Sequence, residues 1–413
     1  MITVVSIAFG LACVIFFISL NEGVYAQLVD DAVRMQAGHV TIEHAEYREA
    51  PAIDLTVRGA TALAEQIAAG GGRGVKGLEG VETVKLLTVG QGVARSGAGA
   101  VGVALIGVQP SIEILTSPLA RKIVEGAYLD DTDDARVVIG RTLADHLDLE
   151  IGKKLVIATN DASGEIVEAL FRVKGIFATG AEEIDGYLVQ APLAPTQRLF
   201  GLAADEVTQI GVVLDDPDRQ QRVIETIAAL VADRSMVGDR VPPDDSAPAA
   251  VLPWQEVSPE LSAFIHFDRI SDRFFLGLLL VLILFTIFNT VLMSVLEREQ
   301  ETAVMMALGT ARRDVALQIL MESAYIGLLG CALGIAFGAG TGLYVQTYGW
   351  DLSSMYEEGL TVSGTAMSTI LHAKVTVELT LGLAAIVFGA TLLLTLGPAR
   401  RAAGVPIADV LRG

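Results

Sequence analysis

Two histidines near the start of the chain are the first residues whose types could bind a metal ion. His39 and His44 flank Glu43, and Glu46 lies close by in the sequence. Imidazole and carboxylate groups are common zinc ligands, but the spacing here meets no standard ligand pattern. We therefore predict no metal site, and we expect both histidines to be exposed at the edge of a strand.

An acidic run and a glycine cluster point to two further kinds of site. Residues 130–134 resemble the start of a calcium loop, which needs glycine at its sixth position and glutamate at its twelfth. Those positions hold Ala135 and Arg141, so we predict an acidic surface turn instead. The glycines at 70–72 do not belong to G-x-x-x-x-G-K-[ST], the loop that binds nucleotide phosphates, and that pattern occurs nowhere in the chain.

The hydrophilic part of the chain also lacks the sequence patterns of a hydrolase. It contains no G-x-S-x-G and no H-E-x-x-H, and the two cysteines, Cys13 and Cys331, both lie in apolar stretches. We therefore predict that the chain is not an enzyme and that it binds no cofactor of its own.

The composition divides the chain between water and membrane. Of its 413 residues, 52% are hydrophobic, and the mean hydropathy is +0.52. These values are too high for an ordinary soluble protein, while the charge is too high for a chain wholly inside a membrane. Between Asn21 and Asp272 there are 21 Lys and Arg against 39 Asp and Glu, a net charge of −18. Because nucleic-acid binding relies on neutralising phosphates, this acidic block predicts no nucleic-acid partner.

Four apolar stretches are each long enough to cross a bilayer, which takes roughly 20 helical residues. No basic segment precedes the first stretch and no cleavage site follows Leu20, so we expect a retained span rather than a signal peptide. The predicted architecture is four transmembrane helices with a large mixed α/β domain at 21–272, which is long enough to form two subdomains. The spans are predicted at 1–20, 273–296, 315–345 and 379–396.

Basic residues in the short segments set the expected orientation, because cytoplasmic loops are enriched in Lys and Arg. Lys374 is the only Lys or Arg in the loop 346–378. The segments 297–314 and 397–413 together hold Arg298, Arg312, Arg313, Arg400, Arg401 and Arg412. We therefore expect both termini and the 297–314 loop in the cytoplasm, with the 21–272 domain and the 346–378 loop outside.

Two of the predicted spans carry patterns that indicate helix packing. One has the G-x-x-x-G spacing that lets two helices approach closely, at Gly330, Gly334, Gly338 and Gly342. Another has polar residues spaced to share one helix face, at Thr286, Asn289, Thr290 and Ser294. Polar groups at membrane depth are costly unless they face protein or water. Ordinary hydrogen bonding between helices and a face lining a cavity between two copies both account for this stripe.

Several segments resemble the FtsX-like ABC transporter permease family, which includes lipoprotein-releasing (LolC/LolE-like) and macrolide-exporter (MacB-like) permeases. Residues 299–313, EQETAVMMALGTARR, resemble the family segment RE-x-(A/G)-hydrophobic-x-RALGA-x-RR. Residues 398–412 resemble its C-terminal signature, and 38–42 and 138–144 resemble the lipoprotein-releasing branch. The resemblance covers essentially the whole length. The sequence departs from it at the N-terminus, where the family's amphipathic lead-in helix is missing, and at Met306, where an arginine is common.

The resemblance implies a permease subunit that relies on a separate cytoplasmic ATPase, which would bind ATP. A short helix at 302–309 is the expected contact, because its apolar side chains offer an adaptable surface suited to a groove, and a glycine would end it. The residues expected to couple to the ATPase are Glu299, Glu301, Val304, Met305, Ala307, Leu308, Gly309 and Arg312.

The implied function is mechanotransmission in the inner membrane, with a periplasmic domain whose movements extract or release lipoprotein or lipid cargo. The implied partners are the ATPase, a second permease copy that is identical or a paralogue, membrane lipid, and a lipoprotein or periplasmic protein. Two alternatives stay open. One is a MacB-like efflux or peptide-export permease, and the other is an FtsX-like membrane scaffold that activates a periplasmic partner such as a cell-wall hydrolase.

Overall fold

The computed structural model describes residues 2–69, 80–236, 249–352, 360–362, 365–367 and 370–403. It divides the chain into two compact units. The membrane unit comprises Met1–Gln27, Ile265–Met355 and Thr369–Gly413, and the outer domain comprises Leu28–Phe264 and Tyr356–Ser368. Two helices, α1 (Ile2–Met35) and α9 (Pro259–Glu297), contribute residues to both units.

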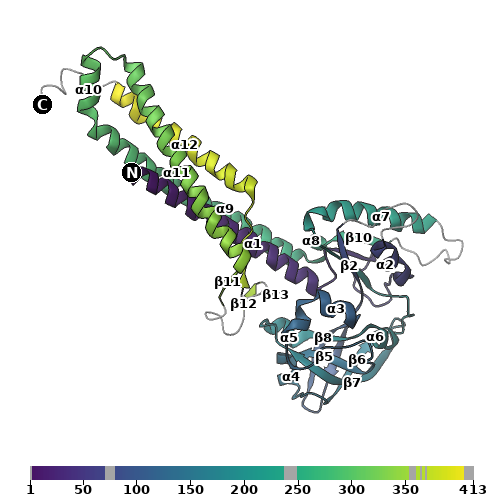
Figure 1. Cartoon of the computed structure of the whole chain (residues 1–413). Helices are drawn as coiled ribbons and strands as arrows, with labels where there is room; N and C mark the ends of the chain where they lie inside the picture. The colour runs from purple at the N-terminus through teal and green to yellow at the C-terminus, as the bar shows by residue number, and fades with distance from the viewer. Residues whose placement is uncertain are drawn as a thin grey trace. The chain divides into compact units, whose positions relative to one another are not determined.

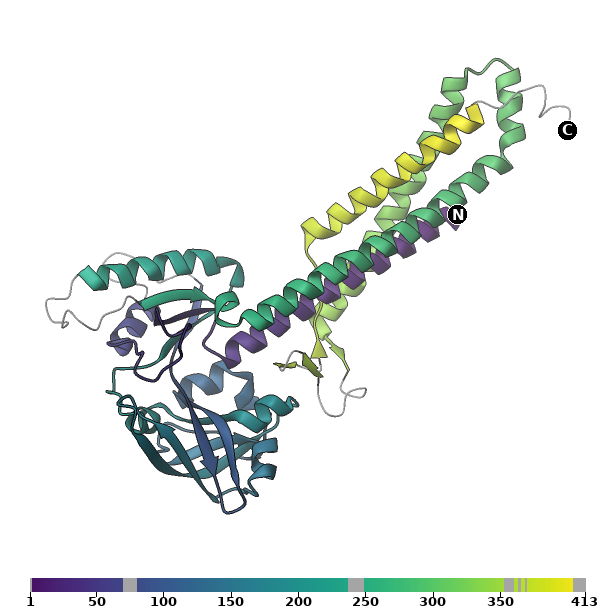
Figure 2. The ribbon, with the colours of Figure 1, turned by 180° about the vertical axis from the view of Figure 1, so that it is seen from behind.

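The membrane unit consists mainly of long apolar helices that lie side by side (Figure 2). Within the described residues, four helices are long and apolar enough to cross a membrane: α1, α9, α11 (Arg312–Tyr348) and α12 (Val377–Ala403). This confirms the predicted architecture of four spans with an α/β domain between the first and the second. α1 and α9 extend beyond the predicted spans at 1–20 and 273–296, since their polar outer ends continue as helix into the outer domain.

Small residues allow α1 and α11 to pack closely in the membrane unit. Gly330, Gly334, Gly338 and Gly342 are all buried along α11. A Cβ atom at Gly334 would lie 2.9 Å from Leu11 Cβ, and one at Gly338 would lie 2.9 Å from Ala12 Cα. These distances are shorter than van der Waals contact, so only glycine fits where the two helices approach.

The outer domain is built on a ten-stranded sheet whose first part is covered by helices on one face. In this part β10 (Ala249–Pro253), β1 (Val40–His44), β9 (Gln209–Leu214) and the first half of β2 (Val81–Arg95) pair in that order, all antiparallel. α2 (Ala60–Ala68) and α7 (Gln220–Met236) cover it (Figure 1). The core between them includes Val40, Ile42, Leu63, Ile67, Ile210, Val212, Val223 and Ile227.

The second half of β2 belongs to a closed six-stranded barrel. Its strands follow the order β2, β3 (Ala100–Val108), β8 (Leu188–Pro192), β5 (Arg136–Gly140), β7 (Ile166–Phe177) and β6 (Lys154–Asn160). β6 pairs with both β7 and β2, which closes the ring. The pair predicted at 84–93 and 100–108 is confirmed as the antiparallel β2–β3 hairpin.

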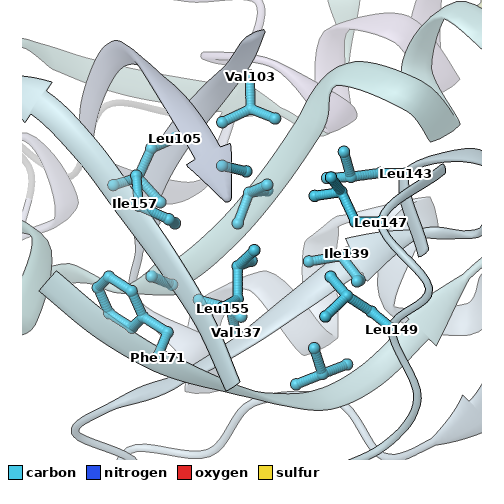
Figure 3. Close-up of a cluster of buried hydrophobic side chains, with 14 of the residues drawn as sticks. Val103, Leu105, Val137, Ile139, Leu143, Leu147, Leu149, Leu155, Ile157 and Phe171 are labelled. Atoms are coloured by element: carbon cyan, nitrogen blue, oxygen red, sulfur yellow. The ribbon is translucent and has the colours of Figure 1, made fainter. Parts of the chain in front are cut away.

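Alternating residues of the barrel strands point inward and fill its interior (Figure 3). Leu105, Ile139, Leu155 and Ile157 are fully buried, and Phe171 is 2% exposed. Each such side chain contributes about 1.5–3 kcal/mol to the free energy of unfolding. The barrel is therefore a packed core and not a channel.

The tenth strand of the sheet, β4 (Ile123–Gly126), pairs antiparallel with β7. Two separate two-stranded sheets pair β11 (Trp350–Asp351) with β14 (Ile370–Leu371), and β12 (Leu360–Val362) with β13 (Thr365–Met367). The remaining elements are short helices: α3 (Pro110–Thr116), η1 (Pro118–Lys122), α4 (Arg141–His146), α5 (Glu182–Tyr187), α6 (Leu193–Leu199), η2 (Pro217–Arg219), α8 (Trp254–Val257) and α10 (Glu299–Ala307).

Candidate functional site

The short helix α10 lies at the end of the helix bundle, between α9 and α11 (Figure 1). Its first turn is stabilised by Thr302, whose backbone N–H and side-chain hydroxyl donate to the Arg298 carbonyl oxygen at 3.0 and 2.7 Å. α10 therefore begins at Glu299, earlier than the helix predicted at 302–309. The Glu299 side chain lies outside the described residues.

One side of α10 is buried against the bundle. Thr302, Ala303 and Met306 are each at most 7% exposed. Met306 packs against Val315 and Ile319 of α11. The apolar side chain of Met306, at a position where the family that the sequence resembles commonly has arginine, therefore helps to hold α10 against α11.

The opposite side of α10 faces outward. Val304 is 46% exposed and Leu308, just after the helix, is 84% exposed. Glu301 and Ala307 are also exposed, and Met305 is half-buried. An exposed leucine at the tip of a helix, with a valine one turn earlier, is a surface that can insert into a groove of another protein.

Gly309 ends this surface with a sharp change of direction. Its φ of +101° is one that glycine adopts readily and other residues rarely do. The backbone N–H groups of Gly309 and Thr310 donate to the carbonyl oxygens of Met306 and Met305, both at 3.1 Å. α11 begins at Arg312, four residues after Leu308. Because the Arg312 side chain is exposed, an acidic group of a partner protein can reach it.

A small cavity of about 80 Å³ lies beneath α10. Residues of α9, α10 and α11 line it, including Ser294, Glu301 and Ser323. An ion pair between Arg298 and Glu322, 3.1 Å apart, stands at its wall. α10 thus lies over a small, partly polar space.

The four polar residues of α9 do not share one environment. The hydroxyls of Thr286 and Thr290 donate to carbonyl oxygens of their own helix at 3.0 and 2.8 Å. Ser294 lines the small cavity. Asn289 is exposed on the outer surface of the bundle, and its side chain forms no hydrogen bond with the described residues.

The last turn of α1 is fixed to the outer domain by a buried lysine. Lys85 of β2 is 1% exposed, and its Nζ donates to the Arg34 carbonyl oxygen at 2.7 Å. The same Nζ lies 2.9 Å from Oε2 of Glu113, which is 2% exposed. Burial lowers the pKa of Lys85, and the Glu113 carboxylate opposes that shift. A cation at this place complements the negative end of the helix dipole.

The Arg34 side chain makes a second attachment to the same strand. Its guanidinium donates to Asp30 of α1 at 2.7 Å and to both carboxylate oxygens of Glu82. The chain then crosses the sheet so closely that a Cβ atom at Gly211 would lie 2.1 Å from the Ala37 carbonyl oxygen. The end of α1 is therefore bonded through both its backbone and its side chain.

The prediction that the two histidines lie exposed at a strand edge is wrong. β1 is flanked by β9 and β10, and β10 comes from a distant part of the sequence. His39 is fully buried and His44 is half-buried. His39 Nδ1 accepts a hydrogen bond from the Leu214 N–H at 3.1 Å, and burial lowers the pKa of His39. Its role is to anchor the chain that leaves α1.

The chain that leads into α9 starts beside the end of α1. The Trp254 N–H donates to the His39 carbonyl oxygen at 3.1 Å, and the Ser258 hydroxyl donates to Gln36 Oε1 at 2.6 Å. Within the outer domain, the residues that end α1 and those that precede α9 are thus joined to each other.

A polar cluster joins the same two helices within the membrane unit. The Tyr25 hydroxyl oxygen lies 2.6 Å from Asp268 and 2.5 Å from Asp272. Asn21 donates to Asp272 at 2.9 Å, and the Arg269 guanidinium lies 5.6 Å from the centre of the Tyr25 ring. α1 and α9 are therefore bonded to each other in both units.

Sequence reasoning did not identify Lys85, Glu113 or Arg34. The sequence signal for Lys85 was a single charge in the apolar run Val-Lys-Leu-Leu at 84–87. A strand with one exposed residue commonly has the same pattern, so the signal did not distinguish a buried lysine from an exposed one. Within the described residues, no group of three or more His, Cys, Asp or Glu is placed to hold a metal ion. In the acidic turn, Asp130 and Asp133 both bind Lys174, which lowers the pKa of Asp130.

The fold and the exposed helix tip define a class: a multi-pass membrane protein with a large α/β domain between its first two spans and a small protruding helix between the second and third. Comparison with known proteins identifies the family. Residues 1–230 match the sequence model of the MacB-like periplasmic core domain, and residues 273–407 match that of the FtsX-like permease C-terminal region. The chain belongs to this family of ABC transporter permeases.

Among its relatives is the lipoprotein-releasing system transmembrane protein LolC of Neisseria meningitidis, which is 21% identical over 100% of this chain and 93% of that protein. The macrolide export ATP-binding/permease protein MacB of Bdellovibrio bacteriovorus is 27% identical over 60% of this chain and 37% of that protein. The crystal structure of the periplasmic region of MacB from Actinobacillus actinomycetemcomitans covers 57% of this chain and 97% of that one, with 12% identity and a TM-score of 0.38.

Proposed function

We propose that this chain couples ATP hydrolysis by a separate cytoplasmic ATPase to movements of its periplasmic domain, and that these movements extract or release lipoprotein or lipid cargo. ATP is bound by the ATPase subunit, while the chain itself is not an enzyme and binds no cofactor. Both termini and α10 lie in the cytoplasm, and the outer domain lies in the periplasm. The observation that carries this proposal is the pair of unbroken helices, α1 and α9, that contribute to both units.

The contact with the ATPase is the exposed side of α10. Leu308 and Val304 enter a groove of the ATPase, and Glu301 and Arg312 contact its rim. When two ATPase subunits close on ATP, α10 moves toward the small cavity beneath it. Because Met306 packs against α11, the displacement reaches the long helices of the bundle.

The outer domain receives this displacement at the end of α1. Lys85 and Glu82 hold the last turn of α1 through the backbone and side chain of Arg34. The Lys85 bond is buried, and it resists slippage better than the partly exposed Arg34–Glu82 pair does, because no water can replace its partners. Force along α1 is therefore delivered to β2, which belongs to both parts of the sheet.

Support for a lipoprotein-releasing role over the alternatives comes from a relative. LolC of Neisseria meningitidis, which is named for lipoprotein release, matches over 100% of this chain, while MacB of Bdellovibrio bacteriovorus matches over 60%. The efflux or peptide-export role, and the scaffold role with a periplasmic hydrolase, would use the same coupling helix and the same attachment of α1. The cargo distinguishes them. Mass spectrometry of the gently purified complex would find acylated proteins for the first role, an outer-membrane channel or adaptor for the second, and a periplasmic hydrolase for the third.

The Leu308→Glu variant tests the coupling contact. A buried anchor residue of an interface is worth at least about 2 kcal/mol, so its replacement by a carboxylate raises the dissociation constant for the ATPase about thirtyfold or more. The matched control is Leu115→Glu in α3, where the leucine is 74% exposed. Both variants should insert into the membrane, and only Leu308→Glu should lose the co-purified ATPase. Wild-type amounts of ATPase with Leu308→Glu would show that α10 is not the contact.

A further inference from the structure

Tyr25 of α1 is the centre of a polar contact with α9, which we call the Tyr25 contact and which consists of Asp268, Tyr25 and Asp272. The tyrosine is 6% exposed. Its hydroxyl oxygen lies 2.6 Å from Oδ2 of Asp268 and 2.5 Å from Oδ2 of Asp272. Both distances are those of O–H···O hydrogen bonds. A tyrosine hydroxyl carries a single proton, however, so it donates to only one carboxylate at a time.

The other short distance in the Tyr25 contact needs a proton from a carboxyl group. The lone pairs of a hydroxyl oxygen and those of an ionised carboxylate do not attract each other, so a second donor must lie between them. Two carboxyl groups that share one site commonly hold one proton between them. With that proton, one carboxyl group donates to the tyrosine oxygen while the tyrosine donates to the other. Each of the two distances then joins one donor and one acceptor.

A neighbouring bond indicates which carboxyl group carries the proton. The Asn21 side chain donates to Oδ2 of Asp272 at 2.9 Å, and such a bond favours the ionised form of a carboxyl group. Within the described residues, Asp268 has no hydrogen bond through its side chain other than the one with Tyr25. The donors therefore follow one order, in which Asp268 donates to Tyr25 and Tyr25 donates to Asp272.

The charges around the Tyr25 contact do not neutralise a second carboxylate. The charged and titratable groups of this region are Glu22 of α1, His266, Arg269 and Arg273 of α9, and His372 and Lys374 of the segment that packs on α1 before α12. Glu22 and Arg269 lie 3.5 Å apart and offset each other. Among the described residues, neither aspartate of the contact forms an ion pair with a basic group. Like charges one helical turn apart repel, so ionising both aspartates is unfavourable.

We propose that the Tyr25 contact is a pH-sensitive joint, in which a proton on Asp268 fastens α1 to α9 and the loss of that proton loosens them. As the pH rises, the proton passes from the Asp268 carboxyl group to water. Two carboxylates then face one hydroxyl, and only one of them keeps its bond to Tyr25. This joint goes beyond the proposed coupling function and operates in the chain alone. In the orientation proposed above, the pH that acts on it is that of the periplasm.

Infrared spectroscopy of the full-length chain in lipid vesicles tests for the proton. A protonated carboxyl group absorbs separately from a carboxylate, and ordinary Asp and Glu side chains are ionised at about pH 7. At that pH we expect a protonated-carboxyl signal from the wild type that is lost in Asp268→Asn. Glu260→Gln, which removes an exposed carboxylate from the first turn of α9, should keep the signal. A wild type without the signal, or an equal signal in Asp268→Asn, would overturn the proposal.

Thermal unfolding of the same samples measures what the proton contributes. The bond that depends on the proton is present at lower pH and lost as the pH rises, so the melting temperature of the wild type should fall by about 2–4 °C between about pH 7 and pH 9. In Asp268→Asn a carboxamide N–H donates to the Tyr25 oxygen and does not titrate, so the fall should be absent. Parallel profiles of the wild type and Asp268→Asn would refute the joint.

A second variant guards against a folding defect in the first. Asp272→Asn removes the other carboxylate of the Tyr25 contact, so it should also lack both the infrared signal and the fall in melting temperature. If either persisted in Asp272→Asn, the two aspartates would not share a proton. None of these measurements requires the ATPase, so their failure would leave the proposed coupling function standing, and a failure of that function would leave the joint unaffected.

Discussion

The buried pair of Lys85 and Glu113 gives the sharpest test of how α1 is attached to the outer domain. Lys85→Met keeps the length and the apolar stem of the side chain but removes its charge. Glu113, which is 2% exposed, is then left without its cation, and the Arg34 carbonyl oxygen loses the Lys85 Nζ that donates to it. Breaking a buried ion pair in this way costs about 3–5 kcal/mol, and the lost hydrogen bond costs about 1 kcal/mol.

The double variant Lys85→Met/Glu113→Leu separates the two effects. Replacing a whole buried pair by apolar residues is often neutral or stabilising, so only the lost bond to Arg34 remains. We expect the double variant to unfold with a free energy within about 2 kcal/mol of the wild type. The single Lys85→Met should be clearly less stable than the double variant.

Tryptophan fluorescence can follow the unfolding of the outer domain alone. The chain has two tryptophans, Trp254 in the outer domain and Trp350 in the membrane unit. In a Trp350→Phe background, a urea titration reports on Trp254, which lies beside the end of α1 through its bond to His39. If Lys85→Met cost less than about 1 kcal/mol, or if the two substitutions were additive, the pair would not be the buried attachment described here.

Two further predictions concern buried groups. Because burial lowers the pKa of His39 below its unfolded value of about 6.5, stability should be full above that pH and decline as the pH falls toward the folded pKa. His39→Asn keeps an acceptor for the Leu214 N–H and should flatten this decline in thermal unfolding between about pH 5 and 6.5; an unaltered profile would assign it to other groups. Gly338→Ala should destabilise the bundle by about 1–3 kcal/mol, because its Cβ would lie 2.9 Å from Ala12. Gly340→Ala, with no atom within 4 Å, is the control, and equal melting temperatures would refute tight packing at Gly338.

The membrane part of the fold was predictable because its signal is local. Each span is one apolar run, and the β2–β3 hairpin is formed by strands adjacent in the sequence. The closure of the barrel was not predictable, since β6 meets β2 across a long stretch of sequence and β8 runs parallel to β3. The burial of His39 depends in the same way on β10, which joins the sheet from the far end of the domain.

The candidate site shows the same division. The position of α10 follows from a short segment, but which of its faces is buried depends on Val315 and Ile319 of the next helix. Lys85 has the sequence context of an exposed strand residue, and it is buried only because α1 and Glu113 cover it. The sequence identified Asn289 as one of four polar residues on α9. Only the structure shows that Thr286 and Thr290, unlike Asn289, donate hydrogen bonds to carbonyl oxygens of their own helix.

The shared strand β2 makes the barrel an exchangeable module. The chain leaves the first part of the sheet after Leu87, builds the entire barrel, and returns at Gln209, which is the direct cross-strand partner of Leu87. Paired residues in antiparallel strands have Cα atoms about 4.5–5.5 Å apart, a gap that a short hairpin turn can bridge. An insertion with such adjacent ends can vary in size and sequence, provided that it keeps Glu113, which lies within it and pairs with Lys85 beside the end of α1. The barrel can therefore diverge between related chains while the first part of the sheet keeps its strand order and its bonds to the end of α1.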